Sequence, residues 1–240
     1  MDLKEEDILK DKIYSHWYYV SKGRAMQFFF RDIKIPEVLD VGAGSGIFSR
    51  QLIDEGICNS AICIDPNYEV EKTERYNGKQ LSFVKDIKKK SNQFILMMDV
   101  LEHVADDVEL LSYYADTLDT DGYILISVPA FQFIWSGHDT FLEHYRRYTI
   151  KTIETIIRRA GMKPLKSCYF FASLFPAIAI IRIIKKILLN RSELKPKSDL
   201  KLYPEWINRI LIHIHHLERH TFFPLNKAFG LSIFCLCRKN

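Results

Sequence analysis

The segment Val38-Leu39-Asp40-Val41-Gly42-Ala43-Gly44-Ser45-Gly46 constrains the fold more than any other part of this chain. It begins within a short apolar run at 37–41 and passes through three glycines into 47–55, which has helical spacing. Because glycine has no Cβ, it can take a positive φ and let a ligand lie against backbone N–H groups. The segment therefore predicts a strand that turns sharply into a helix over a ligand-binding loop.

Short apolar runs alternate with helical stretches along the rest of the chain. Further strands are expected at 61–64, 81–84, 94–98, 123–128, 165–171 and 231–237, and helices at 8–30, 104–118, 150–160 and 204–218. This alternation favours an α/β fold with a doubly wound, mostly parallel sheet, right-handed crossovers and helices on both faces. We expect seven strands, with a helical insertion at 172–230 between the last two.

Acidic residues follow three of the expected strands, namely Asp65, Asp86 and Asp99. Ligands of open α/β sheets bind at the carboxyl ends of strands, where Asp65 could accept from both ribose hydroxyls and Asp86 from an adenine amino group. A glycine triplet alone would also suit a dinucleotide. That fingerprint, G-x-G-x-x-G, would need a third glycine where this chain has Ile47. The loop and the carboxylates together therefore favour a different nucleoside cofactor.

The loop resembles motif I of class I S-adenosylmethionine (SAM)-dependent methyltransferases, and the resemblance continues through 97–104 and 118–129. It implies a Rossmann-like fold with an antiparallel last strand, and SAM as cofactor. The cofactor-binding residues that it implies are Asp40, Gly42, Ala43, Gly44 and Gly46 for the methionine part, Asp65 for the ribose, Asp86 for the adenine, and Asp99 near the sulfonium. A single methyltransferase domain over 1–240 would comprise an N-terminal helical cap at 1–36, a SAM-binding core at 37–171, the insertion at 172–230 and a final strand at 231–240.

Methyl transfer from SAM needs a nucleophile held in line at roughly 3–3.5 Å, and a base where that nucleophile is a hydroxyl. The stretch 136–148 follows the fifth strand and is dense in His, Asp, Arg and Tyr, which favours a substrate loop over a solvated helix face. It resembles a type 11/12-like branch of methyltransferases associated with saccharide and envelope biosynthesis. His138 is the preferred base or orienting residue, and His144 is a further catalytic candidate. Arg146 and Arg147 could bind a phosphate or carboxylate.

His103 is a third catalytic candidate. The sequence Asp99-x-x-Glu102-His103 resembles an element of ubiquinone-pathway and small-RNA-terminal methyltransferases, some of which use a divalent ion. A histidine at the start of a helix is also often a capping or packing residue. Because the sequence shows no further ligand, we predict no metal at this position.

The C-terminal part of the chain is basic and apolar. Residues 163–240 hold 14 Lys and Arg against 4 Asp and Glu, a net +10, whereas residues 1–162 hold 20 against 26, a net −6. Within it, 170–189 is too short and too basic to span a bilayer. The amphipathic stretch 204–218 carries a histidine cluster that we interpret as a polar face rather than a zinc site. The helices of 170–220 could cap the substrate cleft, form a homodimer interface or lie on an anionic membrane surface.

We therefore expect SAM-dependent methyl transfer, with O-methylation of a small-molecule, saccharide or lipid-linked acceptor as the favoured reaction. The alternatives are an RNA methyltransferase, a non-catalytic SAM-binding protein and an NAD-dependent oxidoreductase. Isoleucine-rich helices suit lipid better than a phosphate backbone, so no nucleic-acid partner is expected. The odd cysteine count and the charged first residues favour a cytoplasmic protein, in one reading peripheral at the inner face of the membrane.

Overall fold

The computed structural model describes residues 5, 8–30, 35–87, 91–188 and 196–239. Parts of the expected cap at 1–36, the insertion at 172–230 and the final strand at 231–240 fall outside these described residues. The strands are β1 (Ile35–Val41), β2 (Cys58–Ile64), β3 (Lys72–Tyr76), β4 (Lys79–Val84), β5 (Asn92–Met98), β6 (Leu118–Pro129), β7 (Met162–Phe170) and β8 (Ser232–Lys239). The α-helices are α2 (Trp17–Gln27), α3 (Ile47–Asp54), α4 (Asp107–Asp116), α5 (Gly137–Phe141), α6 (Ile150–Arg159), α7 (Phe175–Leu188) and α8 (Glu205–Thr221).

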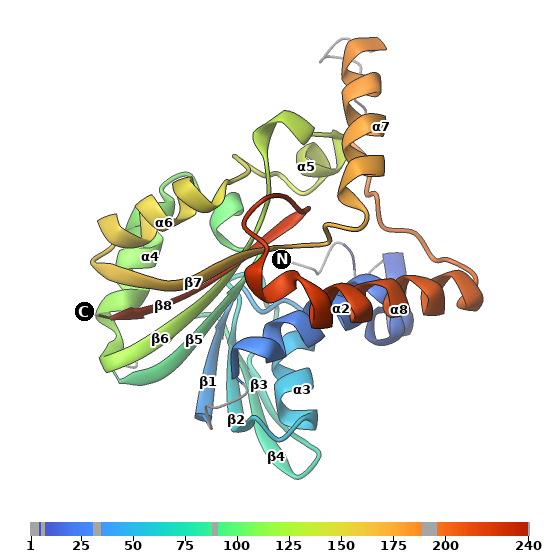
Figure 1. The fold of residues 1–240 in the computed structure, drawn as a ribbon. Coiled ribbons are helices and arrows are strands. Elements are labelled where there is room, and N and C mark those ends of the chain that lie inside the picture. The colour runs from blue at the N-terminus through green and yellow to red at the C-terminus, as the bar shows by residue number, and fades with distance from the viewer. Residues whose placement is uncertain (1–4, 6–7, 31–34, 88–90, 189–195, 240) are drawn as a thin grey trace.

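One sheet forms the centre of the molecule, with the strand order β3-β4-β2-β1-β5-β6-β8-β7 (Figure 1). Strands β4, β2, β1, β5 and β6 run parallel to their neighbours in that series, whereas β8 is antiparallel to both β6 and β7. The mostly parallel α/β sheet with an antiparallel last strand is thus confirmed. The sheet has eight strands rather than the seven expected, because β3 pairs antiparallel with β4 at the edge.

The missed strand β3 has no apolar alternation. Its sequence is KTERY, and none of its residues is buried. A strand at a sheet edge need bury neither face, so a search for hydrophobic periodicity passes over it. The signal that was available is the pair Asn77-Gly78, which joins β3 to β4 with φ of 49° and 77°. Asn-Gly between two strands is the preferred composition of a two-residue hairpin turn.

Helices cover both faces of the sheet, and each face has its own hydrophobic core. Helices α2, α3 and α8 lie on one side, where the aromatic residues of the N-terminal segment meet those of the C-terminal one, as in the contacts of Phe29 with Phe223 and Phe234. Helices α4 and α6 lie on the other side, around residues such as Leu111 and Ile153. The prediction of helices on both faces of the sheet is therefore confirmed.

Side-chain caps set where several helices begin. The predicted helix at 104–118 begins only at Asp107, because Asp106 adopts an extended conformation and accepts a hydrogen bond from the amide of Glu109. Thr149 and Thr152 form a capping box at the start of α6, which begins at the expected residue.

Helices α7 and α8 lie in the chain between the antiparallel neighbours β7 and β8. In Figure 1, α7 projects away from the sheet, and α8 lies alongside α2. Within α7 only Ala179 is buried. Among the described residues, no helix combines the length and the apolar character that crossing a membrane requires.

Candidate functional site

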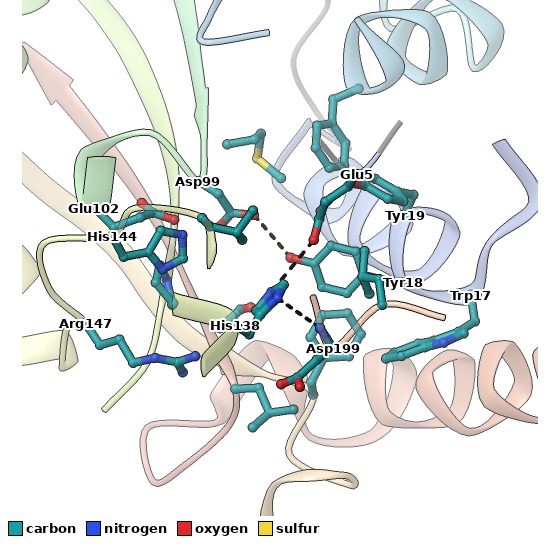
Figure 2. A pocket seen from close by; sticks show the side chains of 18 of the residues that line it. Glu5, Trp17, Tyr18, Tyr19, Asp99, Glu102, His138, His144, Arg147 and Asp199 are labelled. Atoms are coloured by element: carbon teal, nitrogen blue, oxygen red, sulfur yellow. Dashed lines mark hydrogen bonds and ion pairs between the residues drawn. The ribbon is translucent and has the colours of Figure 1, made fainter. Parts of the chain in front are cut away.

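A pocket opens where the carboxyl ends of β1 and β5 meet the N-terminal helix and the segment between β7 and β8 (Figure 2). Strand β1 and the loops that follow β1 and β5 contribute Asp40, Gly42, Ala43 and Asp99 to its lining. The N-terminal helix, the region from α5 to Arg147 and the segment between β7 and β8 contribute further lining residues, among them Trp17, Tyr18, His138, His144, Arg147, Ile178, Arg182, Asp199, Leu200 and Tyr203. The pocket lining therefore combines carboxylates and glycine-loop residues with imidazoles, guanidinium groups and apolar side chains.

The glycine loop has the tight geometry that its composition predicts. Gly42 and Gly46 have φ of +64° and +72°, a region in which L-residues are strained. A Cβ on Gly42 would lie 2.9 Å from Val100 Cγ2, and one on Gly46 would lie 2.9 Å from Phe83 Cε1. Asp40 is buried at the end of β1 and accepts a hydrogen bond of 2.7 Å from the Ser49 hydroxyl. Both the conformation and the space thus demand glycine here.

The remaining cofactor candidates are not all brought into the pocket. Asp65 is buried, and its carboxylate accepts hydrogen bonds from the backbone amides of Gly44 at 3.3 Å and Asn67 at 2.9 Å. It thereby fixes the loop from the side of β2. Asp86 is exposed and accepts from the amide of Ile87 at 2.7 Å. The roles of Asp65 and Asp86 toward ribose and adenine stay predictions, as do those of the glycine-loop residues.

Asp99 is the centre of a network that sequence reasoning did not find. Its carboxylate forms an ion pair with the ammonium group of Lys22 and accepts hydrogen bonds from the hydroxyls of Tyr18 at 3.2 Å and Ser127 at 3.1 Å. The Lys22 side chain is 0% exposed and also donates to the Tyr18 hydroxyl at 2.9 Å. Burial, and then the negative charge of Asp99, raise the pKa of Tyr18 well above its usual range.

Lys22 itself gave a weak signal in the sequence. A lysine in the middle of a helix is usually solvated, so its position within the expected helix at 8–30 does not single it out. The spacing of four between Tyr18 and Lys22 places the two side chains on one helix face, which is the available hint. What the sequence could not show is that this face of α2 meets the end of β5.

His138 lies at the centre of the pocket in Figure 2. Its Nδ1 accepts a hydrogen bond of 3.1 Å from the backbone amide of Asp199, and its Nε2 lies 3.8 Å from Glu5 Oε1. Because Nδ1 is an acceptor in this arrangement, the neutral ring carries its proton on Nε2. Burial lowers the pKa of His138 to about 4. A neutral imidazole that presents an N–H to the cavity is suited to orienting an oxygen of a ligand rather than to removing its proton.

The loop after α5 is held by a buried aspartate. Asp139 accepts hydrogen bonds from Arg147 Nε at 2.6 Å and Nη2 at 3.0 Å, and lies 3.1 Å from His144 Nδ1. Arg146 instead pairs with Asp107 at 2.8 Å. Both arginines are thus engaged by carboxylates of this chain, which gives them a part in shaping the loop beyond the anion binding that the sequence suggested.

His103 and Glu102 lie in the short 3-10 helix η3 (Leu101–His103) after β5. The ring of His103 packs edge-on against that of His144, with centroids 4.6 Å apart. Glu102 is fully buried and lines the pocket, and burial together with the charge of Asp99 raises the pKa of its carboxyl well above the usual value. The three catalytic candidates of the sequence analysis therefore lie in one region, although their roles stay predictions.

Aromatic contacts join the N-terminal helix to the segment after β7. Trp17 stacks on His215 of α8 with centroids 5.3 Å apart, and Tyr18 stacks on Phe171 at 5.5 Å. His215 is buried, and this burial lowers its pKa to about 4. Trp17 and Tyr18 also line the pocket. The same two side chains therefore both pack the N-terminal helix and line the pocket.

Comparisons with known proteins give a consistent result. A family model described as a methyltransferase domain matches residues 14–167. No curated protein matches the chain. A SAM-dependent methyltransferase from Archaeoglobus fulgidus is 18% identical, with a TM-score of 0.54 over 99% of this chain and 98% of that one.

Two further solved structures have similar folds. A protein bound to the Haloferax volcanii methyltransferase activator Trm112 is 16% identical, with a TM-score of 0.58 over 99% of this chain and 96% of that one. Phosphoethanolamine N-methyltransferase 2 of Haemonchus contortus, in complex with SAM, is 14% identical, with a TM-score of 0.56 over 100% of this chain and 60% of that one. At sequence identities this low, the similarity to these three structures shows the fold alone.

Proposed function

The chain belongs to the methyltransferase domain family and is a SAM-dependent methyltransferase, and from this premise we propose that it O-methylates an acceptor that joins a polar headgroup to an apolar part. A saccharide or other hydroxyl compound linked to a lipid is the class favoured. The observation that carries the proposal is the mixed lining of the pocket. Besides the glycine loop, it is lined by the polar His138 and Arg182 and by the apolar side chains of Ile178, Leu200 and Tyr203.

His138 and the apolar side chains of the pocket would have different roles in the proposed reaction. SAM supplies an activated methyl group, so the protein has to place the acceptor oxygen in line and exclude water. The Nε2–H of His138 can donate to that oxygen and hold it, since Nδ1 is already an acceptor. The apolar side chains of the segment between β7 and β8 would hold the lipid part and keep water from the reacting atoms.

We expect His138→Ala to lower turnover by about 100-fold while SAM binding stays within about twofold of the wild type, because the residue would position the acceptor and not the cofactor. The assay incubates the protein with methyl-labelled SAM and a whole extract of the source cells. The extract is then partitioned between organic solvent and water. Label should appear in the organic phase in a form stable to alkali, as a methyl ether is.

Two outcomes would contradict this proposal. Label in ribonuclease-sensitive material would favour the RNA methyltransferase alternative. Label lost as methanol in alkali would show transfer to a carboxylate, and O-methylation of a hydroxyl would be wrong. The control is His213→Ala on α8, an exposed histidine outside the pocket wall, for which turnover should be unchanged.

Peripheral contact with an anionic membrane is the second part of the proposal. A helix that is apolar around most of its surface is normally covered, yet Ile187 and Leu188 of α7 are 77% and 75% exposed. Lys185 and Lys186 lie in the same last turn. Basic side chains beside exposed isoleucines match anionic headgroups above an apolar layer. A membrane would also be the place where a lipid-linked acceptor is found.

Flotation with vesicles tests this contact. The wild type should float with vesicles that contain phosphatidylglycerol and much less with pure phosphatidylcholine. Lys185→Glu/Lys186→Glu should weaken binding by roughly 30-fold or more, since each lost lysine contributes about 1 kcal/mol and each new glutamate repels the anionic surface. The matched control Lys151→Glu/Lys163→Glu makes the same charge change at exposed positions outside α7 and should bind nearly as the wild type does. Equal binding of both variants, or a stable dimer that buries α7 and does not float, would refute the membrane proposal.

A further inference from the structure

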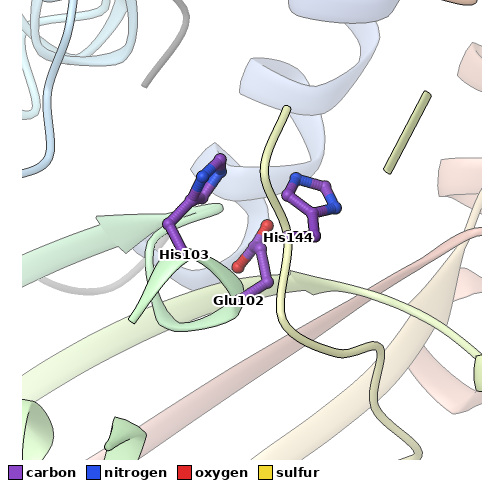
Figure 3. Close-up of side chains that lie close together, drawn as sticks. All are labelled: Glu102, His103 and His144. Carbon is purple, nitrogen blue, oxygen red and sulfur yellow. The ribbon is translucent and has the colours of Figure 1, made fainter. Parts of the chain in front are cut away.

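Three potential metal ligands converge beside the pocket (Figure 3). Glu102 and His103 lie in η3, and His144 lies in the loop after α5. One ligand atom from each residue lies within 4.8 Å of the other two. The backbone amide of Tyr145 donates to the carbonyl of Glu102 at 2.7 Å, so the two segments are joined directly beside these side chains.

The Glu102 carboxylate is the strongest indication of a bound cation. Glu102 is 0% exposed, and no other described residue donates a hydrogen bond to either of its carboxylate oxygens. Buried carboxyl oxygens that lack a hydrogen-bonded partner cost folding free energy whether the group is neutral or charged. Asp99, whose charge acts on this carboxyl group, already has its own ion pair with Lys22. A cation bound at Glu102 would be the partner that these carboxylate oxygens lack among the described residues.

His144 has the support that metal-binding histidines usually have. Its side chain is 5% exposed, and its Nδ1 lies 3.1 Å from Asp139 Oδ1. That contact places the proton on Nδ1 and leaves the lone pair on Nε2, which is buried and has no hydrogen-bond partner among the described residues. A carboxylate that orients an imidazole in this way is the common outer partner of a ligating histidine.

We propose that Glu102, His103 and His144 bind one divalent transition-metal ion of the Zn²⁺ class. Two imidazoles and one carboxylate suit Zn²⁺, Co²⁺, Mn²⁺ or Fe²⁺, whereas Mg²⁺ and Ca²⁺ prefer oxygen ligands. A tetrahedral ion with bonds of about 2.1 Å holds its ligands roughly 3.4 Å apart, so binding would draw these side chains slightly together. The sequence alone predicted no metal because His144 is distant along the chain.

The position left open on the ion would face the pocket, because Glu102 and His144 both line it. Three protein ligands and one open position are typical of a catalytic rather than a structural metal site. The ligand expected there is an oxygen of the acceptor, whose hydroxyl pKa a bound metal lowers. This last assignment rests on the proposed O-methylation, whereas metal binding by the three residues does not.

Metal binding can be measured on the full chain without SAM or acceptor. Chelator-treated protein is titrated with Zn²⁺ in competition with a chromogenic chelator, and with Co²⁺ while its visible absorption is recorded. One equivalent should bind, with the intense absorption of four-coordinate Co²⁺, and millimolar Mg²⁺ should not displace it. His144→Ala and Glu102→Gln should each weaken Zn²⁺ binding by about 100-fold, and Asp139→Asn by about 10-fold.

The control is a second histidine pair that is exposed on α8. The rings of His216 and His220 lie 4.5 Å apart, so they could bind Zn²⁺ weakly without any buried site. His216→Ala/His220→Ala should leave the tight equivalent unchanged. Loss of that equivalent in this variant, or no bound ion in the wild type at about 100 μM Zn²⁺, would overturn the proposal. Circular dichroism of the metal-free variants shows whether each is folded, and Glu102→Gln keeps the size of the side chain if His144→Ala does not fold.

Discussion

Replacing Gly42 by alanine is expected to weaken SAM binding by roughly 100-fold and to leave the sheet folded. An L-residue at φ of +64° costs about 1–2 kcal/mol, and the new Cβ would lie 2.9 Å from Val100 Cγ2. The loop must therefore shift, and the backbone N–H groups that we expect to face the methionine part of SAM move with it. Calorimetric titration with SAM measures the loss, and thermal unfolding shows that the fold remains.

The chain contains a matched control for this variant. Gly78 has φ of +77°, but a Cβ there would meet nothing within 4 Å. Gly78→Ala therefore carries the conformational cost without the collision, and it lies in the β3–β4 turn away from the pocket. Its SAM affinity should equal that of the wild type. If Gly42→Ala bound SAM within threefold of the wild type, the assignment of the glycine loop to the cofactor would be wrong.

The second large effect is expected on stability. Lys22→Met should lower the free energy of unfolding by roughly 3–5 kcal/mol, because removing one member of a buried ion pair leaves the other charge uncompensated. The value should fall toward the lower end, since the Asp99 side chain is 22% exposed and can be partly hydrated. Urea denaturation followed by fluorescence measures the change.

A double variant separates the lost ion pair from lost packing. Lys22→Met/Asp99→Asn removes both charges and should recover about 1 kcal/mol or more relative to the sum of the single variants. Lys72→Met is the control, because Lys72 pairs with Glu74 at 3.5 Å but its side chain is 58% exposed. That change should stay within about 0.5 kcal/mol. A Lys22→Met protein as stable as this control would mean that the buried pair contributes little.

Local sequence signals predicted the parts of the fold that depend on local physics. The glycine loop and the capped start of α6 follow from backbone conformation and hydrogen bonding within a few residues. The strand β3 was missed for the opposite reason, since edge pairing leaves no hydrophobic pattern. For such a strand, the composition of the Asn77-Gly78 turn is the better guide.

The site was predictable only where one segment carries the chemistry. The carboxyl-end positions of Asp40 and Asp99 follow from the parallel sheet, and both line the pocket. The partnership of Lys22 with Asp99, and that of Glu102 with His144, depend on how helix α2 and the loop after α5 pack against the end of β5. Tertiary packing determines such pairs, and the spacing of residues along the sequence does not predict it.

The segment that contains α7 and α8 lies between two paired strands, so its length and sequence can change without a change in the sheet. The chain leaves the sheet after Phe170 and returns at Ser232, and these two residues are partners in the β7–β8 register. The pairing of β7 with β8 therefore does not depend on the length of the segment 171–231, and lengthening a closed loop costs little entropy. If this segment binds the acceptor as proposed, a change in its length or sequence would alter the acceptor site and leave both the β7–β8 pairing and the glycine loop in place.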